Sequence, residues 1–170
     1  AQLRDVFAKL ENPITLRHDE TTHAKQAEMA ALLGGLASVS DRISVESSGV
    51  TLPYPRFRIE VAGRPTGVAF IGIPGGHEFT SLVIAILNAD GKGKLPDAML
   101  TARIRRLAGP IRLRTIVSLS CENCPEVVQA LNLMAILHPD FEHEMVDGEF
   151  IPTEVARLGI QGVPSVVSDA

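Results

Sequence analysis

The chain has 170 residues, of which 45% are hydrophobic and 21% are charged, and its formal net charge is −4. This composition is typical of a folded globular protein and excludes intrinsic disorder, while two cysteines are too few for a disulfide-held scaffold. Dispersed lysine and arginine argue against a nucleic-acid surface, and the lack of any apolar run of about 18 residues argues against a membrane span.

The first hundred residues predict a short amphipathic segment, then strand, helix, three strands and two helices. Apolar residues that alternate with polar ones indicate the strands, and apolar residues at helical spacing indicate the helices. Thr21 or Thr22 can cap the first long helix, and Pro96 suits the first position of the last one. The expected ranges are strands at 13–18, 42–46, 57–61 and 68–73, and helices at 22–37, 77–88 and 96–107.

A second series of predicted strands and helices begins after Gly109-Pro110. Here the sequence predicts a strand at 111–119, a helix at 122–138, a strand at 141–146, a helix at 153–158 and a strand at 163–167. The same element order thus occurs once complete and once cut short. This order predicts an α/β fold of two units packed together, residues 1–108 and residues 109–170.

The two cysteines stand as Cys121-Glu122-Asn123-Cys124, between a predicted strand and a predicted helix. A thiol in the first turn of a helix is close to unpaired backbone N–H groups and the positive end of the helix dipole. Both stabilise the thiolate and lower the thiol pKa from the ordinary value of about 8.5. We therefore expect Cys121 to attack a disulfide and Cys124, one turn further on, to resolve the mixed disulfide.

A Val-Pro dipeptide further along the chain supports this assignment. Val163-Pro164 opens a predicted strand, although proline removes a hydrogen-bond donor from a sheet. A cis peptide bond would account for it, and in a thioredoxin fold such a proline packs beside the dithiol.

Two runs carry a resemblance to a known family. Residues 118–134, SLSCENCPEVVQALNLM, and residues 76–83, GHEFTSLV, resemble the N-terminal domain of the alkyl hydroperoxide reductase flavoprotein subunit. The resemblance covers essentially the whole chain and implies two tandem thioredoxin-like or glutaredoxin-like units. The second unit would then be truncated, because a complete one needs a further strand and a closing helix after Pro164.

The resemblance implies an electron relay in the cytoplasm. A flavoprotein reductase body would pass electrons from NAD(P)H through FAD to Cys121 and Cys124, which would reduce a partner peroxiredoxin. The segment itself would bind no cofactor, because Gly72-Ile73-Pro74-Gly75-Gly76 does not fit the dinucleotide fingerprint. The first unit has His18-Asp19-Glu20-Thr21 where a dithiol would stand, so it would be structural.

Other interpretations stay open for several residues. Glu78 can compensate a helix dipole, or, as the resemblance implies, face the dithiol and shuttle protons. Many relatives carry histidine where this chain has Glu122, which predicts a Cys121 pKa above theirs. A zinc site of Cys121, Cys124, His138 and His143 is disfavoured, because Pro139 would separate the two histidines. The alternative functions are a free-standing disulfide oxidoreductase or isomerase and a non-catalytic docking module.

Overall fold

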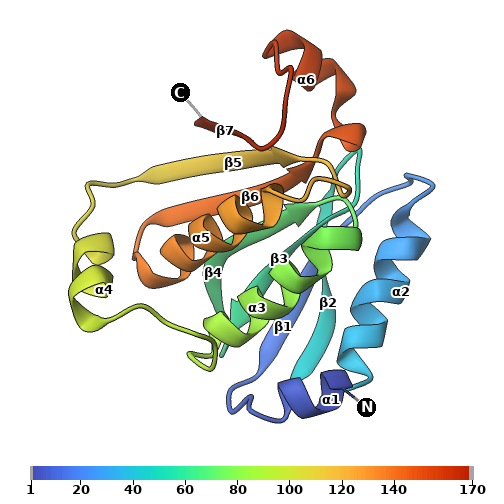
Figure 1. Cartoon of the computed structure of the whole chain (residues 1–170). Coiled ribbons are helices and arrows are strands. Elements are labelled where there is room, and N and C mark those ends of the chain that lie inside the picture. The colour runs from blue at the N-terminus through green and yellow to red at the C-terminus, as the bar shows by residue number, and fades with distance from the viewer. Residues whose placement is uncertain (1, 169–170) are drawn as a thin grey trace.

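The computed structural model describes residues 2–168 and builds them around one seven-stranded sheet in the order β2-β1-β3-β4-β6-β5-β7 (Figure 1). The α/β prediction is confirmed, and each predicted strand and long helix has a counterpart. The strands are β1 (Ile14–Glu20), β2 (Ile43–Thr51), β3 (Arg56–Val61), β4 (Arg64–Ile71), β5 (Ile111–Val117), β6 (Phe141–Asp147) and β7 (Ser165–Ser168). The helices are α1 (Gln2–Phe7), α2 (Gln26–Ala37), α3 (Phe79–Ala89), α4 (Ala98–Arg105), α5 (Cys124–Leu137) and α6 (Pro152–Arg157), with 3-10 turns η1 (Gly76–Glu78) and η2 (Gly148–Phe150).

The sheet joins the early and late parts of the chain through a parallel pair, β4 with β6. Val68 is opposite His143 and Ile71 is opposite Val146 in this pair. Gly67 makes the close approach possible, because it has a φ of +84° and a Cβ there would lie 2.3 Å from the Phe141 carbonyl oxygen. The two parts of the chain therefore share one continuous sheet.

One face of the sheet is covered by helices. Since successive strand residues point to opposite faces, Leu16, Ile59 and Phe70 reach the same side. They join one apolar cluster with Leu33 of α2 and Val128 of α5. Figure 1 shows α3 and α5 side by side over the middle of the sheet, and the two helices are in contact. This face positions the start of α5, where the second cysteine lies.

The other face is charged over most of its area. Glu144 of β6 accepts hydrogen bonds from Arg56 of β3 at 2.6 Å and from Arg114 of β5 at 3.1 Å, which ties both parts of the chain across β4. At the carboxyl ends of the strands, η2 and α6 cover a small second apolar cluster that contains Ile116 and Val146. Only there does this face form a buried core within residues 2–168.

Two helix starts are capped differently from the sequence predictions. Helix α2 begins at Gln26, and Thr21 accepts from the His23 amide in a turn instead of capping the helix. Helix α4 begins at Ala98, because the Asp97 carboxylate accepts from the Leu100 amide at 2.8 Å and so caps it. Pro96 therefore precedes that helix and does not open it.

A chain of buried polar side chains lies between β5, β6 and α5. Thr115 Oγ1 is 2.7 Å from His143 Nε2, and His143 Nδ1 is 2.7 Å from Asn132 Oδ1. All three residues are at most 1% exposed. Because an amide oxygen only accepts, Nδ1 carries the ring proton and Nε2 accepts from the threonine hydroxyl. Both ring nitrogens of the neutral histidine thus have partners, whereas the buried Asn132 Nδ2 has none within residues 2–168.

The buried histidine makes stability depend on pH. Burial lowers the pKa of His143 to about 4 from the ordinary 6.5. As the pH falls from 6.5 to 4, the unfolded chain binds a proton at this residue while the folded chain does not. The free energy of unfolding therefore decreases in that window and is unaffected above it.

We expect this residue to account for a loss of about 2–3 kcal/mol between pH 7.5 and 4.5. Urea unfolding of the wild type and of His143→Gln at both pH values isolates the effect, since carboxylates titrate alike in both. The wild type should lose that much more stability than the variant, and equal losses would contradict a buried neutral histidine.

Candidate functional site

The two cysteines form a disulfide in the turn between β5 and α5. Their Cα atoms are 5.5 Å apart. Helix α5 begins at Cys124 and not at Glu122, so Cys121 lies before the helix and not in its first turn. Its sulfur still faces the helix start, because the Cys124 amide donates to Cys121 Sγ at 3.1 Å. The predicted stabilisation of a Cys121 thiolate by backbone N–H groups therefore retains a structural basis.

The two sulfurs differ in exposure. Cys124 is 0% exposed and belongs to the main apolar cluster, whereas Cys121 is only half-buried. Glu122 and Asn123 between them are exposed. An incoming disulfide can thus approach Cys121, and Cys124 is accessible only from Cys121.

The Val163-Pro164 dipeptide lies against the accessible Cys121 sulfur. The Val163–Pro164 peptide bond is cis, as the sequence predicts. The Val163 carbonyl oxygen is 3.9 Å from Cys121 Sγ. Strand β7 begins at Ser165, one residue after the proline, and pairs antiparallel with β5, which leads to Cys121. Val163 is 38% exposed, so its backbone borders the open side of the disulfide.

A shallow apolar depression continues from Val163. It has a volume of about 320 Å³ and lies between the end of β5 and the segment after α6, with Val117, Val155 and Ile160 among its lining residues. Asp147 also lines it, and burial raises the pKa of that carboxyl above its usual range. An apolar side chain beside a docked disulfide could enter this depression.

Glu78 lies in η1, which contacts the start of α5 and the turn before Cys121. The His77 amide donates to the Leu119 carbonyl at 3.3 Å, and α5 contacts η1. The Glu78 side chain is fully buried, and neither of its oxygens has a hydrogen-bond partner among residues 2–168. Burial raises the pKa of this carboxyl above its usual range. The structure therefore brings a protonatable group to the element that packs behind the dithiol.

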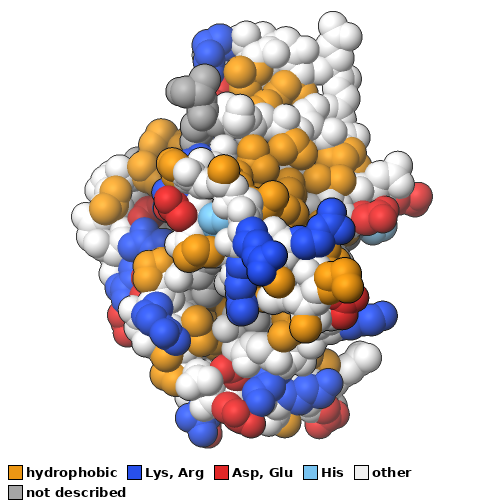
Figure 2. Space-filling model, turned by 90° about the vertical axis from the view of Figure 1, so that its left-hand side faces the viewer, with side chains coloured by type: hydrophobic (Ala, Val, Ile, Leu, Met, Phe, Trp, Pro, Cys, Tyr) orange, Lys and Arg blue, Asp and Glu red, His pale blue; other side chains and the backbone are white. Residues whose placement is uncertain are grey.

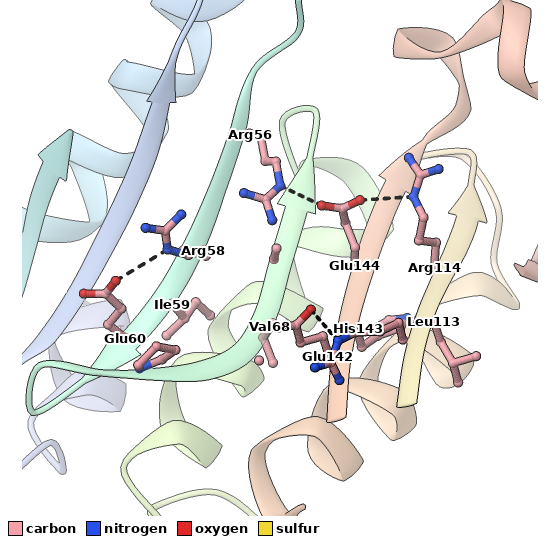
Figure 3. Close-up of a pocket in the computed structure, with 14 residues that line it drawn as sticks. Arg56, Arg58, Ile59, Glu60, Val68, Leu113, Arg114, Glu142, His143 and Glu144 are labelled. Carbon is pink, nitrogen blue, oxygen red and sulfur yellow. Dashed lines mark hydrogen bonds and ion pairs between the residues drawn. The ribbon is translucent and has the colours of Figure 1, made fainter. Parts of the chain in front are cut away.

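A larger groove on the charged face is a different kind of feature. It has a volume of about 480 Å³, and Pro65, Gly67 and Ala69 of β4 are among its lining residues. Figure 3 shows the charged side chains that surround it, among them Arg58, Glu60 and Glu144. Its walls carry paired charges, including Arg58 with Glu60 and Arg112 with Glu142. Each arginine of the lining thus has a carboxylate partner, and Glu144 is shared by Arg56 and Arg114.

Exposed apolar side chains lie on the side of the molecule where Figure 1 places α4. Figure 2 shows this side, with hydrophobic side chains gathered in its upper half. The exposed large residues of α4 and β7 are Met99, Leu100 and Val166. Strand β7 is an edge strand of the described sheet.

The zinc alternative has no support within residues 2–168. No group of three or more histidine, cysteine or acidic side chains there is arranged to hold a metal ion. His143 is used in the buried polar chain, and His138 lies at the end of α5 with Nε2 2.9 Å from the Leu107 carbonyl oxygen. No helix in that range is long and apolar enough to cross a membrane.

Some buried polar residues do not follow from the sequence pattern, namely Thr115 of β5, Asn132 of α5, and His143 and Asp147 of β6. Asn132 gave a signal, because it interrupts an otherwise apolar stretch of the helix predicted to be buried on several sides. Its partner, His143, lies in β6, the next element along the chain, and pattern alone does not reveal that contact.

Known proteins resemble the chain over nearly its whole length. No family model matches it. An NADH dehydrogenase of Bacillus subtilis is 40% identical over 98% of the chain, and an alkyl hydroperoxide reductase of the AhpF type from Escherichia coli is 39% identical over 97%. In both cases the match covers 32% of the relative, so the chain spans about a third of their length.

Solved structures agree with the curated relatives. The NTD_N/C domain of alkylhydroperoxide reductase AhpF from Enterococcus faecalis matches with a TM-score of 0.90 and 32% identity, over 99% of this chain and 87% of that one. A protein disulfide oxidoreductase from Aeropyrum pernix matches with a TM-score of 0.82 and 19% identity, over 99% of this chain and 81% of that one. The second match establishes likeness of fold alone.

Proposed function

Because this chain belongs to the family of the N-terminal domain of the alkyl hydroperoxide reductase AhpF, an oxidoreductase, we propose that it relays electrons by thiol–disulfide exchange. Cys121 and Cys124 take two electrons from the dithiol of a flavoprotein body and pass them to the disulfide of a partner peroxiredoxin, which reduces alkyl hydroperoxides. The observation that carries the proposal is the half-buried Cys121 sulfur, bonded to a fully buried Cys124 and bordered by the Val163 carbonyl.

The exchange follows from the different exposure of the two sulfurs. In the reduced chain the Cys121 thiolate attacks one sulfur of the partner disulfide, and the other partner sulfur leaves as a thiolate and takes a proton. The Cys124 thiol then loses its proton and attacks Cys121 Sγ. The Cys121–Cys124 bond forms, the mixed disulfide breaks and the second partner sulfur leaves with a proton. Two electrons and two protons have then passed to the partner.

The surroundings of Cys121 support docking of an extended segment. Val163 is partly exposed and places its carbonyl beside the sulfur, and the apolar depression next to it can receive a neighbouring side chain. The segment would therefore place its disulfide over Cys121 and an apolar residue over Val117 and Ile160.

The flavin and nicotinamide belong, in this proposal, to the remainder of the full-length protein. The run from Gly72 to Gly76 lacks the glycine spacing of a dinucleotide site. The reaction also requires a compartment that keeps thiols reduced, and for this reason we propose the cytoplasm.

A direct test uses a purified two-cysteine peroxiredoxin in its disulfide form. The reduced chain, mixed with it without oxygen, should reduce one peroxiredoxin disulfide per chain and become oxidised itself. A thiol-reactive polymer that retards reduced proteins on a gel reports both changes. If the peroxiredoxin stays oxidised while the chain reduces a small disulfide normally, the proposed partner is wrong.

Glu78 is proposed to move the proton that Cys124 gains and loses. A buried carboxyl with a raised pKa keeps its proton to a higher pH than an exposed one and can act as a proton donor and acceptor during thiol exchange. Glu78→Gln should therefore slow exchange at pH 7 by about tenfold or more. The measurement is the stopped-flow rate of exchange between the reduced chain and the oxidised peroxiredoxin.

The matched control is Glu126→Gln, which removes a carboxylate from the first turn of α5 that is not buried. It should leave the rate nearly unchanged. Equal rates for wild type and Glu78→Gln at pH 7 would remove the proton-transfer role and leave Glu78 as a helix-end charge.

A further inference from the structure

The buried polar chain connects the two elements that carry the sulfurs. Thr115 is in β5, six residues before Cys121, and Asn132 is in α5, which begins at Cys124. His143 of β6 lies between them and contacts both at 2.7 Å. The chain therefore spans from the strand that leads to one cysteine to the helix that starts with the other.

The remaining contacts between α5 and the sheet are apolar. Val128 and Ala135 are buried against the sheet, and apolar packing has no preferred direction along a surface. The other side-chain hydrogen bonds of α5 go to neighbouring helices, from Gln129 to Ser81 and from Arg105 to the Leu137 carbonyl. Among residues 2–168, the Asn132–His143 bond is thus the side-chain hydrogen bond that fixes α5 along the sheet.

The turn between β5 and α5 has few hydrogen bonds of its own. Residues 118–123 form no regular element. The Cys121 amide donates to the nearby Ser118 carbonyl at 3.0 Å, and the Leu119 carbonyl accepts from the His77 amide of η1 at 3.3 Å, but neither bond joins β5 to α5. Disulfide closure tolerates only a narrow range of positions of its two cysteines. A helix that shifted along the sheet would carry Cys124 out of that range.

We propose that Thr115, His143 and Asn132 are positioning residues for the dithiol. Directional hydrogen bonds in a buried site select one arrangement of the elements they join. Here they hold β5 and α5 in the arrangement that the disulfide needs, so they raise the effective concentration of one thiol at the other. This inference rests on the proposed redox cycle of Cys121 and Cys124.

Loss of the polar chain should therefore weaken the disulfide relative to the dithiol. Thr115→Val keeps the shape of the side chain and removes the hydroxyl that donates to His143. We expect the equilibrium between disulfide and dithiol to move toward the dithiol by about three- to tenfold. For a two-electron couple this makes the midpoint potential about 15–30 mV less negative.

Two controls separate positioning from general stability. Thr115→Ser keeps the hydroxyl and should retain the wild-type equilibrium. Thr66→Val removes another buried hydroxyl of the same sheet. This hydroxyl donates to the Ile59 carbonyl at 2.7 Å and makes no hydrogen bond to α5 within residues 2–168. It should lower the stability of the oxidised and reduced chains equally and leave the equilibrium unchanged.

The measurement is the fraction of oxidised chain in dithiothreitol buffers of known ratio. A shift in Thr115→Val alone supports the inference, and a Thr115→Val equilibrium equal to that of the wild type overturns it. Should Thr115→Val fail to fold, the same equilibrium is measured for Asn132→Leu. A shift toward the dithiol again supports the inference, and an equilibrium equal to that of the wild type again overturns it. A wild-type chain with no reversible equilibrium would instead refute the proposed function itself.

Discussion

Replacing Cys124 by serine should stop the exchange after its first step and leave the chain covalently bound to its partner. Cys121 can still attack a peroxiredoxin disulfide, but no second thiol is present to release the product. A one-to-one mixed disulfide should accumulate, and dithiothreitol should reduce it to the two separate proteins. Cys121→Ser should form no adduct and lose about a thousandfold or more in exchange rate, because the buried Cys124 cannot replace the nucleophile.

Non-reducing gels and intact-mass measurement distinguish these outcomes. Ser120→Ala, a change in the exposed neighbour of Cys121, is the matched control and should behave as the wild type. If Cys121→Ser forms the adduct and Cys124→Ser does not, the roles of the two cysteines are reversed.

Gly67→Ala should unfold or severely destabilise the chain. Gly67 has a φ of +84°, which L side chains rarely adopt, and an added Cβ would lie 2.3 Å from the Phe141 carbonyl oxygen. Backbone must shift on one side of the β4–β6 pair, which joins the early and late parts of the chain. We expect a loss of about 3–5 kcal/mol in the free energy of unfolding, measured by urea titration.

Gly34→Ala provides the contrast. Gly34 lies inside α2, and a Cβ there would meet nothing within 4 Å. This substitution should stabilise the chain by about 0.5–1 kcal/mol, because alanine favours the helix. A Gly67→Ala chain within about 1 kcal/mol of the wild type would show that the two parts of the sheet are less tightly joined than the structure indicates.

The features that sequence predicts best are local. The dithiol between a strand and a helix depends on residues 111–138 alone, and so does the expectation that Cys121 is the attacking cysteine. The cis bond at Pro164 is predictable because a proline at the start of a strand needs a special explanation. The structure shows the greater exposure of Cys121 and the cis bond, while the roles of both cysteines stay predictions.

Helix starts are harder to predict, because several polar residues compete for them. Thr21 and Asp97 are both good caps by type, but only Asp97 bonds to the first turn of its helix. The sequence pattern puts Cys121 next to a helix expected to start at Glu122, whereas the helix begins at Cys124 and the Cys121 sulfur keeps a bond to its amide. Such shifts of a few residues change which groups face a sulfur.

Apart from the approach of Val163 and Pro164 to Cys121, the long-range contacts could not be predicted from the residue pattern. The parallel pairing of β4 with β6 joins residues more than 70 positions apart. Glu144 of β6 accepts hydrogen bonds from Arg56 of β3 and from Arg114 of β5. The division of the chain near residue 109 stays a prediction, and the continuous sheet shows only that both parts share strands. The partners of Asn132 and the surroundings of Glu78 likewise depend on how distant elements pack.

The midpoint potential of the Cys121–Cys124 couple tests the proposed relay most directly. The chain is equilibrated in dithiothreitol or glutathione buffers of known potential, and the two redox forms are counted after thiols are blocked. We expect a reversible two-electron couple at roughly −200 to −270 mV, suited to reducing a partner. A value near about −120 mV, or cysteines that show no reversible couple, would contradict the relay.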